Sequence, residues 1–142
     1  MPVNSQRKLT AIVSADVVGY SRLMGIDEAG THARLKTLYL ELVEPKITEH
    51  GGRVVKLMGD GLLAEFSSVV DAVNWAVEIQ TKIAESYIDN PDSLEIEYRV
   101  GVNLGDVIVD GDDIFGDGVN VASRLQEISE TGGICISEKV YA

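Results

Sequence analysis

Two aspartates lie at positions where the negative charge of a carboxylate needs a partner in the folded chain. Asp16 ends the apolar run Leu9–Asp16, and Asp60 is placed between two glycines at the tip of a predicted hairpin. A charge that ends a buried strand must be solvated, paired or bound to metal. Each aspartate alone also has a structural explanation, because strand-end aspartates cap helices and Asp-Gly is a common hairpin turn. Together, on adjacent central strands, they predict a cradle for a hard divalent cation such as Mg²⁺.

A lysine belongs to the same predicted hairpin. Lys56 lies four residues before Asp60, and the two-residue period of a strand puts it on the face of Val54 and Met58. A lysine among apolar strand residues can simply extend its ammonium to water at a sheet edge. It can equally serve as a positively charged hydrogen-bond donor to a ligand.

Three more polar residues cluster around a predicted helix near the C-terminal end. Asn120 and Arg124 are i,i+4 neighbours and therefore project from one helix face, while Asp113 precedes Asn120 by seven residues in an acidic loop. Solvation of Arg124 and a capping role for Asn120 would explain each residue singly.

Several other kinds of site are absent from the sequence. It contains neither the G-x-x-x-x-G-K-[ST] phosphate loop nor a G-x-G-x-x-G between the first strand and helix. His32 and His50 are far apart and have no cysteine cluster beside them, which argues against zinc. A calcium loop that starts at Asp110 would place Ile114 where an oxygen ligand is needed.

The composition restricts the classes of partner that the protein is expected to bind. The 142 residues carry a net charge of −11, opposite to what phosphate backbones and anionic membranes attract, so neither nucleic acid nor direct membrane contact is expected. The single cysteine, Cys135, forms no internal disulfide, and no apolar run reaches the length of a membrane span. These features predict one cytoplasmic domain over residues 1–142, which could belong to a larger parent protein.

The elements that must position these residues follow from periodicity. A buried strand is predicted over Leu9–Asp16, and a helix over Asp27–His50 with a kink or a break near Val43-Glu44 because Pro45 lies inside its pattern. The hairpin Arg53–Met58 and Leu62–Phe66 comes next, and Ser67-Ser68 then cap a long amphipathic helix.

The second half predicts another hairpin, Glu95–Leu104 with Val107–Asp110, around Gly105-Asp106. The elements that follow are the acidic loop Gly111–Gly118, a helix over Val119–Ser129 and a strand over Gly133–Ser137. The resulting order β-α-β-β-α-β-β-α-β predicts an α+β fold of ferredoxin-like type, an antiparallel or mixed sheet with helices on one face.

Three sequence strings taken together resemble a known family. SADVVGYS, VVKLMGDGLLAEF and DIFGDGVNVASR are similar in order and spacing to the catalytic domain of class III (universal) adenylate and guanylate cyclases, from about Lys8 to the chain end. The resemblance implies the α+β cyclase fold and conversion of ATP to 3′,5′-cyclic AMP and pyrophosphate.

The resemblance also implies roles for seven positions. Two divalent ions per site, Mg²⁺ or Mn²⁺, would be held by Asp16, Asp60 and the backbone carbonyl of Val17. Lys56 and Asp113 would read the adenine base, where guanylate cyclases typically carry Glu and Cys. Asn120 would orient the ribose and Arg124 would stabilise the transition state.

The same resemblance implies a homodimer, because in the family the metal aspartates come from one subunit and the base-reading pair, Asn and Arg from the other. An isologous dimer would then hold two sites. The family domain continues past Ala142 into a strand pair with a phosphate-contacting lysine, so the chain is expected to lack its last strands.

Two alternatives remain at this point. A catalytically silent cyclase homology domain could bind nucleotide or dimerise as a signalling module; the missing strands and Gly133, where some family members carry an arginine, leave this open. A diguanylate cyclase or polymerase-palm relative would also place metal carboxylates on a strand and a hairpin. Its Gly-Gly-Asp/Glu-Glu-Phe signature differs from Met58-Gly59-Asp60-Gly61, and it gives Asn120 and Arg124 no role.

Overall fold

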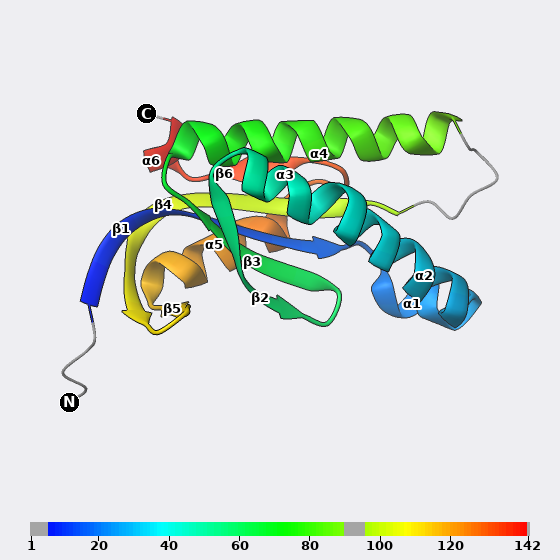
Figure 1. The fold of residues 1–142 in the computed structure, drawn as a ribbon, viewed down its shortest axis with the longest axis horizontal. Helices are drawn as coiled ribbons and strands as arrows, with labels where there is room; N and C mark the ends of the chain where they lie inside the picture. Colours follow the sequence, from blue (N-terminus) through cyan, green and yellow to red (C-terminus); the bar gives the residue numbers. More distant parts are fainter. Residues whose placement is uncertain (1–5, 90–95, 142) are drawn as a thin grey trace.

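A mixed sheet forms the centre of the molecule (Figure 1). The computed structural model describes residues 6–89 and 96–141 and orders the strands β2-β3-β1-β4-β5, with β6 added in parallel to β4. The strands are β1 (Gln6–Val17), β2 (Gly52–Met58), β3 (Gly61–Phe66), β4 (Tyr98–Asp110), β5 (Asp113–Phe115) and β6 (Ile134–Ile136). The apolar run of β1 is paired along both edges by β3 and β4, and its alternate side chains pack in two clusters on the two faces of the sheet, so it is buried on both faces.

The prediction of a hairpin at Gly105-Asp106 is wrong. β4 continues through both residues because β1 pairs with it from Gln6 to Val17, and Thr10 lies opposite Gly105. The chain reverses five residues later, at Gly111, whose φ of 60° is available to glycine at little cost. The predicted acidic loop therefore contains β5, while Glu95 lies outside the described residues.

The helices are α1 (Tyr20–Ile26), α2 (Glu28–Leu38), α3 (Glu44–Glu49), α4 (Val69–Asp89), α5 (Asp117–Ile128) and α6 (Glu138–Tyr141). Of the kink or break predicted near Val43-Glu44, the structure shows an irregular turn rather than a break: a π-helical segment, η1 (Tyr39–Val43), joins α2 to α3, and Pro45 lies in the first turn of α3. Ser68 caps α4 as predicted, accepting a hydrogen bond from the Asp71 amide at 3.3 Å.

Helices cover both faces of the sheet rather than the one face predicted (Figure 1). Alternate residues of β1 face opposite ways: Val13 packs in a cluster with Trp75 of α4, whereas Ile12 packs in a second cluster with Ala122 of α5. Gly101 allows α5 to approach, since a Cβ there would be 2.4 Å from the carbonyl oxygen of Ala122. Asp16 and Lys56 lie on the face of the sheet that α5 covers.

The sheet curls so that its two ends meet on the α5 side. The Arg53 guanidinium of β2 donates to the carbonyl oxygen of Asp112, next to β5, at 3.0 Å. It also donates to the buried carboxylate of Glu65 at 2.7 Å, which accepts from Lys8 and Thr10 as well. This network joins β1, β2 and β3 and brings the β2–β3 hairpin close to β5.

Candidate active site

The structure brings Asp16 and Asp60 together. Asp16 is opposite Gly61 in the β1–β3 register, and the Val17 amide donates to the Asp60 carbonyl oxygen at 3.2 Å. A Cβ on Gly61 would lie 3.0 Å from the Asp16 Cβ, so glycine here leaves room beside the carboxylate. Gly59 forms the turn with a φ of 59°, which a residue with a side chain rarely adopts.

The environment of Asp16 disfavours its negative charge. Burial, followed by the nearby charge of Asp60, raises the pKa of Asp16 above its ordinary value, and a hydrogen bond from Gln126 and the charge of Arg99 oppose this only in part. Two carboxylates that repel one another in a half-buried place fit a divalent cation, which would remove the repulsion. Among the described residues no group of three His, Cys, Asp or Glu side chains could hold a metal, so the remaining ligands would come from backbone, water or phosphate.

Gln126 is a site residue that the sequence reading missed. Its side-chain amide donates to Asp16 Oδ1 at 2.7 Å from the last turn of α5. The signal was available, because Gln126 follows Ala122 by four residues and so continues the buried stripe of the helix. A buried glutamine in such a stripe needs a polar partner across the interface.

Lys56 and Asp113 also meet, as an ion pair. The Lys56 ammonium lies 3.3 Å from Asp113 Oδ1 and 5.8 Å from the centre of the Phe115 ring. A β-bulge between Val54 and Lys56 changes the predicted face. Lys56 pairs with Leu63 and shares a face with Met58 but not with Val54, and this is the face that α5 covers.

Asn120 and Arg124 are exposed on α5, and Arg124 is not among the charges that shift the pKa of Asp16. Residues 124 and 126 are two positions apart, or about 200° around a helix, so Arg124 is opposite the side from which Gln126 reaches Asp16. The structure therefore groups the seven predicted positions into an aspartate pair with Val17, a lysine–aspartate pair, and an exposed helical pair.

Across the described residues, no helix combines the length and apolar character needed to cross a bilayer.

The fold and these groups define the class of protein. Residues 3–142 match the adenylate and guanylate cyclase catalytic domain family, and the chain belongs to this family. The crystal structure of an adenylate/guanylate cyclase/hydrolase from Silicibacter pomeroyi superimposes with a TM-score of 0.90 at 46% identity, covering 97% of this chain and 80% of that one. The predicted class III cyclase fold is thereby confirmed.

The relatives include adenylate cyclases, and the similar solved structures include both adenylyl and guanylyl cyclases. The Rhizobium meliloti protein "Putative adenylate cyclase 3" is 48% identical over 136 residues, which are 96% of this chain and 23% of that protein. The adenylyl cyclase CyaB from P. aeruginosa superimposes with a TM-score of 0.83 at 26% identity, covering 98% of this chain and 81% of that one. The chain thus spans about a quarter of the length of its first curated relative.

Proposed function

We propose that the chain is an adenylate cyclase domain that converts ATP to 3′,5′-cyclic AMP and pyrophosphate. Membership of the cyclase family supports the cyclisation reaction. The Lys56–Asp113 pair supports ATP, rather than GTP, as the substrate. An adenine edge presents a ring acceptor beside an amino donor. The Lys56 ammonium can donate to the first and the Asp113 carboxylate can accept from the second. Guanine presents a keto acceptor and an imino donor in the reverse order, so the same pair would leave it poorly matched.

The aspartate pair would hold the cation. Asp16, Asp60 and the Val17 carbonyl are the residues for two Mg²⁺ or Mn²⁺ ions, which when bound would neutralise phosphate charge and lower the pKa of the ribose 3′-hydroxyl. Gln126 would fix the rotamer of Asp16 so that its carboxylate stays oriented toward the cation.

The reaction forms one bond and breaks one. The ribose 3′-oxygen loses its proton and bonds to the α-phosphorus, and the bond from that phosphorus to the bridging oxygen breaks to release pyrophosphate. Asn120 would hydrogen-bond the ribose and orient this oxygen. The guanidinium of Arg124 would donate to the phosphoryl oxygens as negative charge develops on them.

A homodimer would complete the site. Arg124 is exposed on the side of α5 opposite Gln126, which supports a role for it, together with the exposed Asn120, at the aspartate pair of a second chain. An isologous dimer would then contain two equivalent sites. We further propose that the domain works in the cytoplasm, where ATP is available and Cys135 stays reduced, within a longer protein such as its relatives.

Turnover of ATP tests this function. The chain with Mg²⁺ or Mn²⁺ is expected to form cyclic AMP from ATP and much less cyclic GMP from GTP, as measured by chromatography of the products. Asp60→Asn should reduce the rate by at least about 100-fold, because it removes a charged cation ligand. Asp89→Asn, at the exposed end of α4, is the matched control and should keep the rate. Nucleotide binding without turnover would contradict the proposal and support the silent module instead.

A further inference from the structure

Lys56 and Asp113 belong to the two ends of the sheet. β2 and β5 are the first and last strands of the order β2-β3-β1-β4-β5, so no strand pairing in the described part of the chain joins them. The separation of the two side chains therefore depends on contacts made between β2 and β5 outside the strand ladder. Because this pair is proposed to recognise adenine, the contact that fixes their separation bears on the choice of nucleotide.

The Lys56–Asp113 ion pair is too weak to hold the two strands by itself. The side chains are 40% and 36% exposed, and the ammonium lies 3.3 Å from Asp113 Oδ1. Exposed ion pairs contribute little, because water screens the charges and two long side chains lose freedom. The same exposure leaves the pair open to a base, whose hydrogen bonds would replace the ion pair. A second contact is then needed to keep β5 in place when the ion pair opens.

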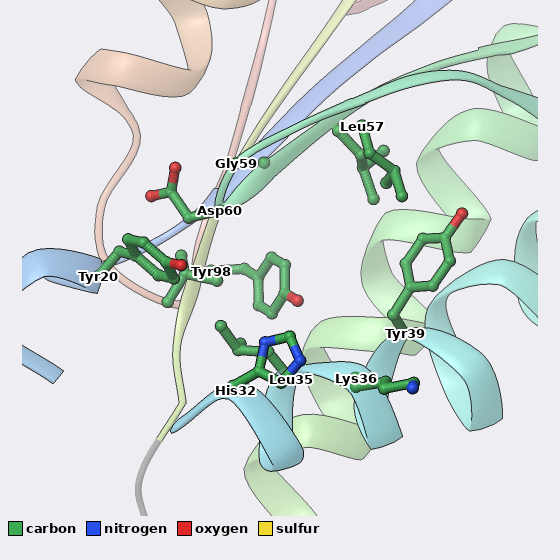
Figure 2. Close-up of a pocket in the computed structure, with 12 residues that line it drawn as sticks. Tyr20, His32, Leu35, Lys36, Tyr39, Leu57, Gly59, Asp60 and Tyr98 are labelled. Carbon is green, nitrogen blue, oxygen red and sulfur yellow. The ribbon is translucent and has the colours of Figure 1, made fainter. Parts of the chain in front are cut away.

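Packing alone leaves the end of the hairpin free to shift. Leu57 is 56% exposed, and with Gly59 it borders a cavity of about 240 Å³ that separates the hairpin from Tyr39 of η1 (Figure 2). On the α5 side, Val55 packs in one cluster with Ile114 of β5. Apolar packing is non-directional, so it brings the strands together without fixing how far one slides along the other.

Arg53 supplies a directed contact between the two strands. Its guanidinium donates from Nε to Glu65 Oε1 at 2.7 Å and from Nη1 to the carbonyl oxygen of Asp112 at 3.0 Å. Glu65 is a firm anchor, because it is only 6% exposed and also accepts from Lys8 and Thr10. The planar guanidinium presents its donors in a fixed fork, so the two bonds set where Asp112 lies relative to β2 and β3.

The position of the Asp112 carbonyl in turn determines where the Asp113 carboxylate lies. The two residues share one peptide unit, which is planar and rigid. Asp113 Oδ1 accepts a hydrogen bond from the Ile114 amide at 2.8 Å, which ties the carboxylate to the β5 backbone. On β2, Lys56 follows Arg53 by three residues, or about 10 Å along the strand. Arg53 therefore acts on Asp113 through the backbone of β5.

We infer that Arg53 is a positioning residue for nucleotide selection. It holds β5 so that Asp113 stays at the separation from Lys56 at which one adenine edge can bond to both. This role rests on the proposed function, in which Lys56 and Asp113 read the base. Without the bridge, the carboxylate would follow the lysine or drift from it, and the donor and acceptor would no longer match the adjacent groups of adenine.

The ratio of kcat/KM for ATP to kcat/KM for GTP tests this role. Arg53→Ala should lower the ratio by at least about tenfold, mainly through a higher KM for ATP. Arg53→Lys keeps the charge but lacks the fork, so it should lower the ratio as well. A chain that is merely destabilised would lose activity with both nucleotides and keep the ratio. An unchanged ratio in Arg53→Ala, or full recovery in Arg53→Lys, would overturn the role.

Arg7→Ala is the matched control for the loss of an arginine. Arg7 is exposed on β1, and the alternation of a strand places it on the face opposite its neighbour Lys8, which reaches Glu65. This variant should keep the ratio. If Arg53→Ala does not fold, Arg53→Lys retains a charge beside Glu65 and is used for the same measurements.

Hydrogen exchange tests the positioning without turnover. In the nucleotide-free protein, the Ile114 amide of Arg53→Ala should exchange at least about tenfold faster than in wild type, since β5 loses its link to β2. The amide of Ile79, buried in the middle of α4, should keep its rate. Unchanged exchange at Ile114 would refute the positioning even if the ratio changed. A wild-type chain that forms no cyclic AMP would contradict the proposed function, and the exchange rates would still decide whether Arg53 holds β5.

Discussion

Asp16 combines a role in the site with a cost to the fold. Its carboxylate is half-buried and repelled by Asp60, and only Gln126 and Arg99 offset this. Asparagine at the same position keeps an oxygen that can accept from Gln126 but removes the charge. The proposed site is therefore one where binding a cation and maximising stability pull in opposite directions.

Asp16→Asn should stabilise the chain without metal and remove its response to metal. We expect the free energy of unfolding in chelator to rise by about 0.5–1 kcal/mol, because the repulsion with Asp60 is lost. Urea unfolding with and without millimolar MgCl₂ measures both effects, with Asp89→Asn as the control. A variant that is less stable in chelator, or that still gains stability from Mg²⁺, would show that Asp16 is not a strained cation ligand.

Glu65 ties the hairpin to the sheet and should make stability depend on pH. Burial alone would raise the pKa of Glu65, but hydrogen bonds from Arg53 and Lys8 and their charges outweigh it and hold the pKa below its ordinary value. Because the folded pKa is the lower one, this contribution is complete above the unfolded pKa and is lost as pH falls through the folded pKa.

Glu65→Gln should therefore lower the free energy of unfolding by about 2 kcal/mol at pH 7, because it removes the charged acceptor of the two cationic donors, Arg53 and Lys8. Thermal unfolding from neutral pH downward should show the two proteins converging below about pH 5 as the wild-type carboxylate takes up its proton. A constant difference across this range would mean that the ion pairs contribute little and packing decides the effect.

At the scale of elements, the close approach of α5 to β4 is what places Gln126 beside Asp16. The approach depends on Gly101, where a Cβ would lie 2.4 Å from both the Ala122 carbonyl oxygen and the Gln126 amide nitrogen. Backbone atoms cannot move aside as a flexible side chain can, so the helix as a whole would have to shift.

Gly101→Ala should destabilise the fold by about 2–3 kcal/mol and move α5 outward. Gly25→Ala is the matched control, because a Cβ there meets nothing within 4 Å inside α1, and it should gain about 0.5–1 kcal/mol. Chemical denaturation measures both variants. Equal stabilities would mean that the sheet and helix adjust freely, which would also weaken the case for Gln126 as a fixed partner of Asp16.

Elements with a strong local pattern were predictable from sequence. The apolar run of β1, the glycine-bounded hairpin and the amphipathic α4 all form, since each is encoded by neighbouring residues. The errors arise where distant pairing decides. Gly105 looks like a turn, yet β1 holds it in a strand, and the bulge that turns Lys56 toward α5 has no local signal.

The site residues were predictable in identity more than in arrangement. Asp16 with Asp60 and Lys56 with Asp113 do meet, although each pair lies far apart in sequence. The resemblance to a family named these residues; alternation and spacing alone left each with a structural explanation. Whether they bind metal and nucleotide stays a prediction.

For the whole molecule, the proposed division of the site between two subunits can be tested by mixing two inactive variants. Asp60→Asn and Arg124→Ala each should inactivate a homodimer, because each removes a group that every site needs. In a heterodimer of the two, one site carries both defects, whereas the other takes Asp60 from the Arg124→Ala subunit and Arg124 from the Asp60→Asn subunit.

Random pairing of equal amounts makes half of the dimers heterodimers with one of two sites intact, so the mixture should recover about a quarter of wild-type cyclic AMP formation. Two subunits that exchange slowly must be unfolded and refolded together for this ratio to appear. A mixture of Asp60→Asn with Asp16→Asn is the control, since both defects lie in the same half and no intact site can form. No recovery in the test pair would contradict the division of the site between two subunits, which was inferred from the exposed Arg124 on the side of α5 opposite Gln126. Recovery in the control would show that Asp16 and Asp60 of one chain do not serve the same site.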